Sequence, residues 1–144
     1  MRKKNSTNSI NEESLTLNCG MSYTLHVLGG RWKPAILFSL LKGKMRYSEL
    51  RKIIAGVSER MLVTQLRELE ADGLVNRIIH PEVPPRVEYE LTPMGKDTAP
   101  MLRHMSAWGN RHRAILQSNV AETDSNLPAI SVKKKTASKK EAAA

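Results

Sequence analysis

The side chains best suited to chemistry in this 144-residue chain lie along one predicted helix that starts at Ser58. The Arg60 guanidinium can donate two hydrogen bonds to a guanine, and the Gln65 amide can pair with two atoms of an adenine. Thr64 offers a hydroxyl and a methyl group. These groups recognise the edges of bases and do not break bonds. We therefore predict that double-stranded DNA is read by Ser58, Arg60, Thr64 and Gln65.

The helix that carries these residues is amphipathic. Leu62, Leu66 and Leu69 recur at spacings of four and three residues, so they share one buried face. A shorter helix is predicted over residues 47–54, and a three-residue turn around Gly56 joins the two. Two helices joined in this way form a helix-turn-helix, whose second helix fits the major groove of B-DNA.

After Gly73 the hydrophobic pattern changes to a period of two, which is typical of strands. Residues 74–79 and 86–91 are predicted to form two strands, separated by a loop with three prolines. A hairpin directly after a helix-turn-helix makes it winged. Arg77 and Arg86 flank the loop, and we expect them to enter a minor groove or to hold phosphates.

Other polar residues suit contacts with the DNA backbone. Lys44, Arg46 and Ser48 lie at the entrance of the first helix of the helix-turn-helix. Arg67 lies deeper along the second helix, where it either reaches a phosphate or pairs with a neighbouring glutamate. Contacts of this kind add to the salt dependence of binding more than to its specificity.

The rest of the ordered pattern is helical. Helices are predicted over residues 21–28, 32–41 and 96–117. The expected fold class is therefore mainly α with a small β-hairpin wing (α+β), a winged helix-turn-helix. The expected organisation is a flexible polar N-terminal arm over residues 1–14, one domain over residues 15–118, and a disordered basic tail over residues 119–144.

The charge distribution agrees with a polyanionic partner. The chain has 23 Lys and Arg against 14 Asp and Glu, a net charge of +9. Residues 31–67 hold nine bases and two acids, which gives a local charge of +7. We predict that this segment, which includes Lys33 and Arg51, is the electrostatic footprint on DNA, whereas the acids gather elsewhere.

An enzyme is not expected. The sequence has no glycine-rich phosphate loop, no HExxH and no Ser/His/Asp or Cys/His grouping. Its four histidines are isolated, so neither a metal site nor a cofactor is expected. No stretch approaches the roughly 20 apolar residues of a membrane span, and the polar start lacks a signal-peptide pattern. We expect a cytoplasmic protein without a membrane partner.

Three segments carry a resemblance to a known family. They read YTLHVLGGRWKPAILFSLLKGKMRYSELRK, VSERMLVTQLRELEADGL and LTPMG. Over residues 17–116 the chain resembles the HxlR-type winged-helix regulators. The resemblance implies a homodimer built from the N-terminal arm and the first and last helices, a binder of operator DNA that is more often a repressor. The interface residues it implies are Tyr23, Leu25, Leu102, Met105, Trp108 and Ile115.

The single cysteine leaves two alternatives open. The Cys-Pro usual in this family is replaced here by Cys19-Gly20, and some members use that cysteine to sense oxidants or electrophiles. Cys19 has no adjacent Lys, Arg or His that would lower its thiol pKa. It is therefore either a redox sensor or an inert, packed thiol. A small-molecule effector is the other expectation, with Met101 and Met105 as candidates to line its cavity.

A different class of function is a winged-helix module that binds a protein and has lost DNA binding. DNA affinity that falls steeply with salt favours a regulator, whereas binding to a protein that is indifferent to salt favours the module.

Overall fold

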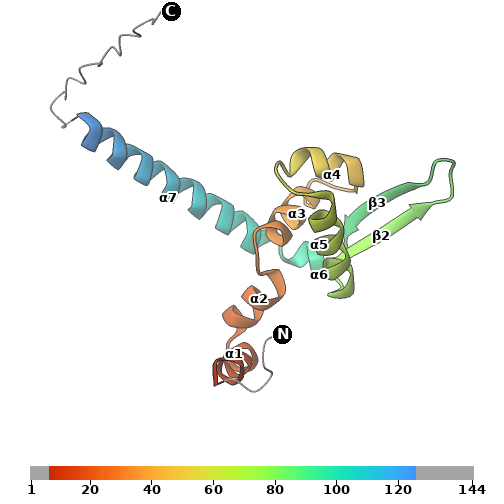
Figure 1. Ribbon diagram of the computed structural model, residues 1–144, viewed down its shortest axis with the longest axis horizontal. Helices are drawn as coiled ribbons and strands as arrows, with labels where there is room; N and C mark the ends of the chain where they lie inside the picture. Colours follow the sequence, from red (N-terminus) through yellow and green to blue (C-terminus); the bar gives the residue numbers. More distant parts are fainter. Residues whose placement is uncertain (1–6, 126–144) are drawn as a thin grey trace, which may run out of the picture. The chain divides into compact units, whose positions relative to one another are not determined.

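The computed structural model describes the backbone of residues 7–125 and the side chains of residues 10–15 and 18–120. It is mainly helical, with one small sheet (Figure 1). Along the chain the elements are α1 (Thr7–Asn18), α2 (Gly20–Leu28), α3 (Trp32–Leu40), β1 (Met45–Arg46), α4 (Tyr47–Ile53), α5 (Glu59–Ala71), β2 (Val75–His80), β3 (Arg86–Leu91), α6 (Pro93–Asp97) and α7 (Ala99–Ser125).

The helix-turn-helix is confirmed in α4 and α5. Ser58 caps α5: its hydroxyl accepts a hydrogen bond from the backbone N–H of Met61 at 3.2 Å. The turn before the cap includes Gly56 at φ +84°, and Gly73 at φ +72° follows the last turn of α5. Both values lie in the left-handed region that favours glycine, so glycine suits the turn before α5 and the turn after it.

The sheet is antiparallel, with the strand order β1-β3-β2. The predicted hairpin is confirmed, and its two strands extend away from α4 and α5 (Figure 1). Val75 pairs with Leu91 at its base, and both are buried. The third strand, β1, was not predicted; it places Arg46 opposite Glu88. Two residues are too few to show a period of two, so the sequence carries no pattern for it.

The core lies between α3, α4, α5 and the base of the sheet. Leu37, Leu50, Leu62 and Leu69 are fully buried there, in agreement with the predicted amphipathic faces. Leu102, predicted at a dimer interface, is only 3% exposed and belongs to the same core. That expectation is corrected, because a side chain packed inside its own chain has no surface left for a second copy.

Two predicted boundaries were wrong. Residues 7–14, expected in a flexible arm, belong to α1, and α7 continues through residues 119–125, expected in the tail. The helix expected over residues 96–117 is divided into α6 and α7, because α6 ends at Thr98, whose hydroxyl donates to the Gly95 carbonyl at 2.6 Å. The predictions for residues 1–6 and 126–144 lie outside the described residues.

Candidate nucleic-acid interface

The outward face of α5 is polar and open. Because Leu62 and Leu66 point into the core, Arg60, Thr64 and Arg67 are exposed on the opposite side. The Thr64 hydroxyl donates to the Arg60 carbonyl at 2.8 Å, which leaves its acceptor lone pairs and its methyl group for an external partner. This face presents donors, acceptors and a methyl group, the kinds of group that recognise base edges.

Gln65 lies at the side of that face and is half-buried. Its Nε2 lies 3.5 Å from Glu68 Oε2, a long hydrogen bond within α5. The amide oxygen of Gln65 makes no hydrogen bond with any other described residue. An amide held through its nitrogen in this way still has an acceptor and a second N–H to offer.

Two contacts fasten α4 to the first turn of α5. Arg51 forms a short ion pair with Glu59, and the Tyr47 hydroxyl lies 3.5 Å from the Glu59 carbonyl oxygen. Burial raises the pKa of Tyr47, and the negative charge of Glu59 adds to the shift. The hydroxyl therefore stays protonated near neutral pH and can donate. Arg51, counted in the basic footprint, is engaged within the protein.

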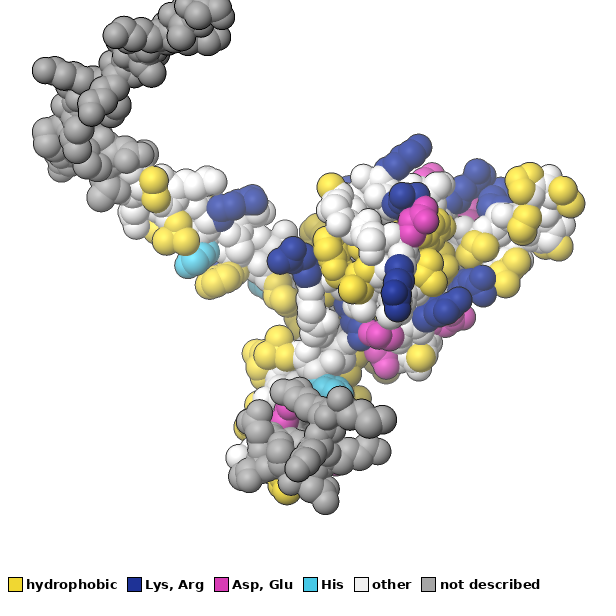
Figure 2. All heavy atoms as spheres, viewed as in Figure 1, with side chains coloured by type: hydrophobic (Ala, Val, Ile, Leu, Met, Phe, Trp, Pro, Cys, Tyr) yellow, Lys and Arg dark blue, Asp and Glu magenta, His cyan; other side chains and the backbone are white. Residues whose placement is uncertain are grey.

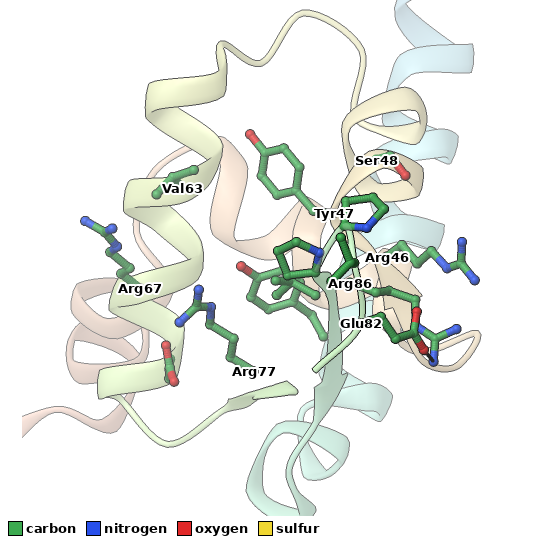
Figure 3. Close-up of a pocket in the computed structure, with 14 residues that line it drawn as sticks. Arg46, Tyr47, Ser48, Val63, Arg67, Arg77, Glu82 and Arg86 are labelled. Atoms are coloured by element: carbon green, nitrogen blue, oxygen red, sulfur yellow. Dashed lines mark ion pairs between the residues drawn. The ribbon is translucent and has the colours of Figure 1, made fainter. Parts of the chain in front are cut away.

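A groove of about 750 Å³ lies between α5, the start of α4 and the hairpin (Figure 3). Arg67 of α5 and Arg77 of β2 lie on one side of it, and Arg46 and Arg86 lie on the other. Five predicted DNA contacts thus share one groove: Arg46, Ser48, Arg67, Arg77 and Arg86. Ser58, Arg60, Thr64, Gln65 and Lys44 are not among its lining residues.

The sequence did not single out the other side chains of this groove. Tyr47, Val63 and Tyr89 line it together with Val83, Pro84 and Pro85 of the hairpin loop. In the sequence, the spacing of these residues indicates only the strands and helices to which they belong. Only the packing of α4 and α5 against the sheet brings them to one place, so no local sequence signal marks them.

The hairpin arginines differ from each other. Arg86 Nη2 lies 3.3 Å from Glu82 Oε1, and its Nε lies 3.9 Å from Glu88 Oε1. Within the part of the chain that the structure describes, Arg77 forms no ion pair and is exposed. Arg77 is therefore exposed to solvent, whereas Arg86 is half-buried beside two carboxylates.

Glu88 is the centre of a small charged cluster on the hairpin. His80 Nε2 lies 2.7 Å from Glu88 Oε2. The hydrogen bond from His80 lowers the pKa of Glu88, and the positive charges of Arg86 and Lys44 lower it further, against the effect of burial. Glu88 is thus held within the hairpin by its basic neighbours His80 and Arg86.

Basic side chains gather over α4, α5 and the hairpin on the face drawn in Figure 2. Lys44, Arg46 and Ser48 are exposed, as expected for backbone contacts. Lys33 departs from the expected footprint, because it is buried and forms ion pairs with Glu68 and Asp72. The local charge available to DNA is therefore smaller than the sequence count.

Cys19 stands directly before α2, at its N-cap, and is half-buried. The Ser22 backbone N–H lowers the pKa of its thiol, and the Ser22 hydroxyl and the Met21 N–H add to this effect. The sequence predicted no such shift, because no Lys, Arg or His is adjacent to Cys19. A helix start supplies N–H donors that the residue types do not reveal.

Five of the six predicted interface residues are exposed. Tyr23 and Leu25 lie on α2, and Met105, Trp108 and Ile115 lie on α7. Two helices thus expose several large apolar side chains. Such exposure is typical of surfaces that bind another molecule.

Two features are absent from the described residues. No group of three or more His, Cys, Asp or Glu side chains there is placed to hold a metal ion. None of their helices has the length and hydropathy to span a membrane.

A capped, outward-facing helix beside a hairpin and an arginine-lined groove defines a winged helix-turn-helix DNA-binding protein. Comparison with known families agrees: residues 27–116, which are more than half of the chain, match the HxlR-like helix-turn-helix family. The chain therefore belongs to the HxlR-like helix-turn-helix family, and its function is that of a DNA-binding transcriptional regulator.

Individual relatives support this assignment. The chain is 44% identical over 100 residues to the uncharacterized HTH-type transcriptional regulator YybR of Bacillus subtilis, covering 69% of this chain and 80% of that one. Among solved structures it is similar to the redox regulator HypR in its reduced form, with 44% identity, a TM-score of 0.64, and coverage of 68% and 97%. It is also similar to reduced YodB from B. subtilis, with 33% identity, a TM-score of 0.57, and coverage of 65% and 91%.

Proposed function

We propose that this chain acts as a homodimer that binds operator DNA with α5 of each protomer in a major groove, and that it represses transcription in the cytoplasm. The observation that carries the proposal is the arrangement of α5. Three leucines bury one face of this helix in the core, and the side chains of Arg60 and Thr64 are exposed on the other face.

The contacts divide into two groups. Base edges are assigned to Ser58, Arg60, Thr64 and Gln65. The DNA backbone is assigned to Lys44, Arg46, Ser48, Arg67 and Arg77. The protein groove between α5 and the hairpin supports the assignment of backbone contacts. Arg67 and Arg77 lie on one side of it, where they suit the phosphates that separate the major groove of DNA from the minor groove. Arg86 is not assigned to the DNA backbone, because its guanidinium already lies beside the carboxylates of Glu82 and Glu88.

The homodimer is supported by the apolar side chains that α2 and α7 leave exposed. Tyr23, Leu25, Trp108 and Ile115 are each more than half exposed. Burying such residues against a second copy removes apolar surface from water. This burial stabilises the dimer by about 25 cal/mol for each Å² of apolar surface. Two copies related by a twofold axis also present two α5 helices, which matches operators with repeated half-sites.

We further propose that oxidants or electrophiles control DNA binding through Cys19. The lowered pKa of its thiol increases the thiolate fraction, which is the reactive form. Two similar proteins support this proposal: HypR is a redox regulator, and YodB has been solved both reduced and after diamide treatment. Loss of the oxidant response in Cys19→Ser, with DNA binding retained, is the expected result. An unchanged response would leave the thiol inert.

The experiment that tests the proposal is a titration of the reduced protein with duplex DNA from upstream of its own gene and with random duplex. We expect preference for the upstream duplex and an affinity that falls steeply as salt is raised. Analytical ultracentrifugation of the same samples is expected to give two protomers for each duplex. Absence of any preference, with binding that is indifferent to salt, would contradict DNA recognition and favour a protein-binding module.

A further inference from the structure

Lys33 has an unusual environment for a charged residue. Among the residues that the structure describes, it is the one charged residue that is buried, with 9% of its surface exposed. Removing an ammonium group from water is unfavourable unless it is paired and hydrogen-bonded. Its partners therefore indicate what the residue is placed to hold.

Those partners come from two different helices. Lys33 Nζ donates to the Val27 carbonyl at 3.3 Å, in the last turn of α2. The same Nζ lies 2.9 Å from Glu68 Oε2 and 3.9 Å from Asp72 Oδ2, at the end of α5. A single ammonium group on α3 thus joins the end of α2 to the helix that is assigned to the major groove.

The chain geometry keeps Lys33 close to Val27. The two residues are separated by a turn that contains Gly29 and Gly30. A Cβ at Gly29 would lie 2.4 Å from the Leu25 carbonyl oxygen, and Gly30 has φ +94°. Neither position accepts another residue without distortion, so this backbone path between α2 and α3 requires glycine at both positions.

The network continues from Glu68 to a base-reading candidate. The oxygen that accepts from Lys33, Glu68 Oε2, is also the one 3.5 Å from Gln65 Nε2. Glu68 is 48% exposed and sits on the same helix as Gln65, three residues later. Without Lys33, the Glu68 side chain would sample several rotamers in solvent. The Gln65 amide, which bonds to the Glu68 carboxylate, would then lose its fixed orientation.

We propose that Lys33 and Glu68 are positioning residues for DNA recognition: Lys33 fixes the Glu68 carboxylate, and this carboxylate orients the Gln65 amide toward an adenine. The proposal rests on the proposed function, because it deepens the base-reading role of Gln65. It assigns specificity to two residues that do not themselves touch DNA.

The chain offers a matched control in Asp72. This residue also pairs with Lys33, but among the described residues no hydrogen bond joins it to Gln65, so Asp72→Asn tests the ion pair without the relay. The informative variants are Lys33→Met, Glu68→Ala and Glu68→Gln, with Gln65→Ala as the reference. Denaturation curves check that each variant folds. If Lys33→Met does not fold, the two substitutions at the half-exposed Glu68 carry the test.

The first readout is base preference, measured by selecting binding sites from randomised duplexes. At the positions that Gln65→Ala relaxes, we expect Glu68→Ala and Lys33→Met to reduce discrimination by at least about fivefold. Positions set by Arg60 should not change, and Asp72→Asn should resemble the unmodified protein. A Glu68→Ala profile that matches Asp72→Asn at every position would overturn the proposal while the proposed function stands.

The second readout needs no DNA. The side-chain amide resonances of Gln65 in the ¹⁵N spectrum of the free protein are expected to move in Glu68→Ala and Lys33→Met, and to stay in place in Asp72→Asn. Unmoved resonances would overturn the proposal. If the unmodified protein shows no base preference, the proposed function fails, and with it the link from this network to specificity.

Discussion

Nε2 of His80 lies 2.7 Å from Oε2 of Glu88, so a histidine of β2 and a glutamate of β3 are joined across the hairpin. The bond runs diagonally, since Glu88 is directly opposite Ile78 and His80 is opposite Arg86. Arg86 approaches the second Glu88 oxygen at 3.9 Å. This cluster stabilises the charged form of one carboxyl in the outer part of the hairpin.

The lowered pKa of Glu88 predicts an acid-sensitive hairpin. A carboxyl whose pKa is lower in the folded than in the unfolded protein stabilises the fold fully above its ordinary value of 4.5, and this contribution disappears as the pH falls through the folded value. We expect the free energy of unfolding to fall below about pH 4.5, and Glu88→Gln to weaken that dependence. Urea denaturation between pH 7 and pH 3 measures it, with Glu90→Gln on the same strand as control. An identical acid response in Glu88→Gln would contradict the prediction.

The Ser58 cap sets the stability of the first turn of α5. Ser58→Ala removes the acceptor for the Met61 N–H, and we expect it to lower the free energy of unfolding by about 1 kcal/mol. Ser58→Asn keeps a capping oxygen and should retain most of that stability. Guanidinium denaturation compares the three proteins. Equal stability of all three would show that the cap does not contribute.

Gly95 allows α6 to lie against the end of the α5–β2 connection. A Cβ at this position would lie 2.1 Å from the Leu74 carbonyl oxygen, which is backbone and cannot move aside easily. We expect Gly95→Ala to lower the free energy of unfolding by roughly 1–3 kcal/mol. Gly109→Ala, in another helix and with open space around the added methyl group, should leave stability unchanged or raise it by up to about 1 kcal/mol. Thermal and chemical unfolding of both variants checks this difference.

Cys19 should react at a lower pH than an ordinary thiol. The Ser22 N–H and hydroxyl both lower its pKa, so the rate of alkylation by iodoacetamide should reach half its maximum below the pH typical of cysteine. Ser22→Ala removes only the hydroxyl, so the midpoint should rise part of the way. A midpoint at the usual cysteine value in the unmodified protein would contradict the pKa shift.

The elements that position the interface were largely predictable because their signals are local. The leucine spacing of α5, the Ser58 cap and the alternation of the hairpin residues each reflect a pattern within a few neighbours. The division of α6 from α7 was missed because it depends on Thr98, whose hydroxyl donates to the Gly95 carbonyl at 2.6 Å, and a single threonine in a helical pattern does not mark a helix end.

The pairing of charges was not predictable in the same way. Lys33 and Arg51 were counted with the bases that face DNA, whereas folding places them against Glu68 and Glu59. A count along the sequence cannot show this, because the partners lie on other helices. The same limit explains why Leu102 was assigned to an interface, although the fold buries it.

The central claim is that α5 reads bases, and the most direct test compares Arg60→Ala with Lys44→Ala on specific and random duplexes. We predict that Arg60→Ala weakens binding to the specific duplex by roughly 1–3 kcal/mol and changes binding to random DNA far less. Lys44→Ala should weaken both alike and reduce the salt slope by about one. Equal losses from Arg60→Ala on the two duplexes would contradict the claim.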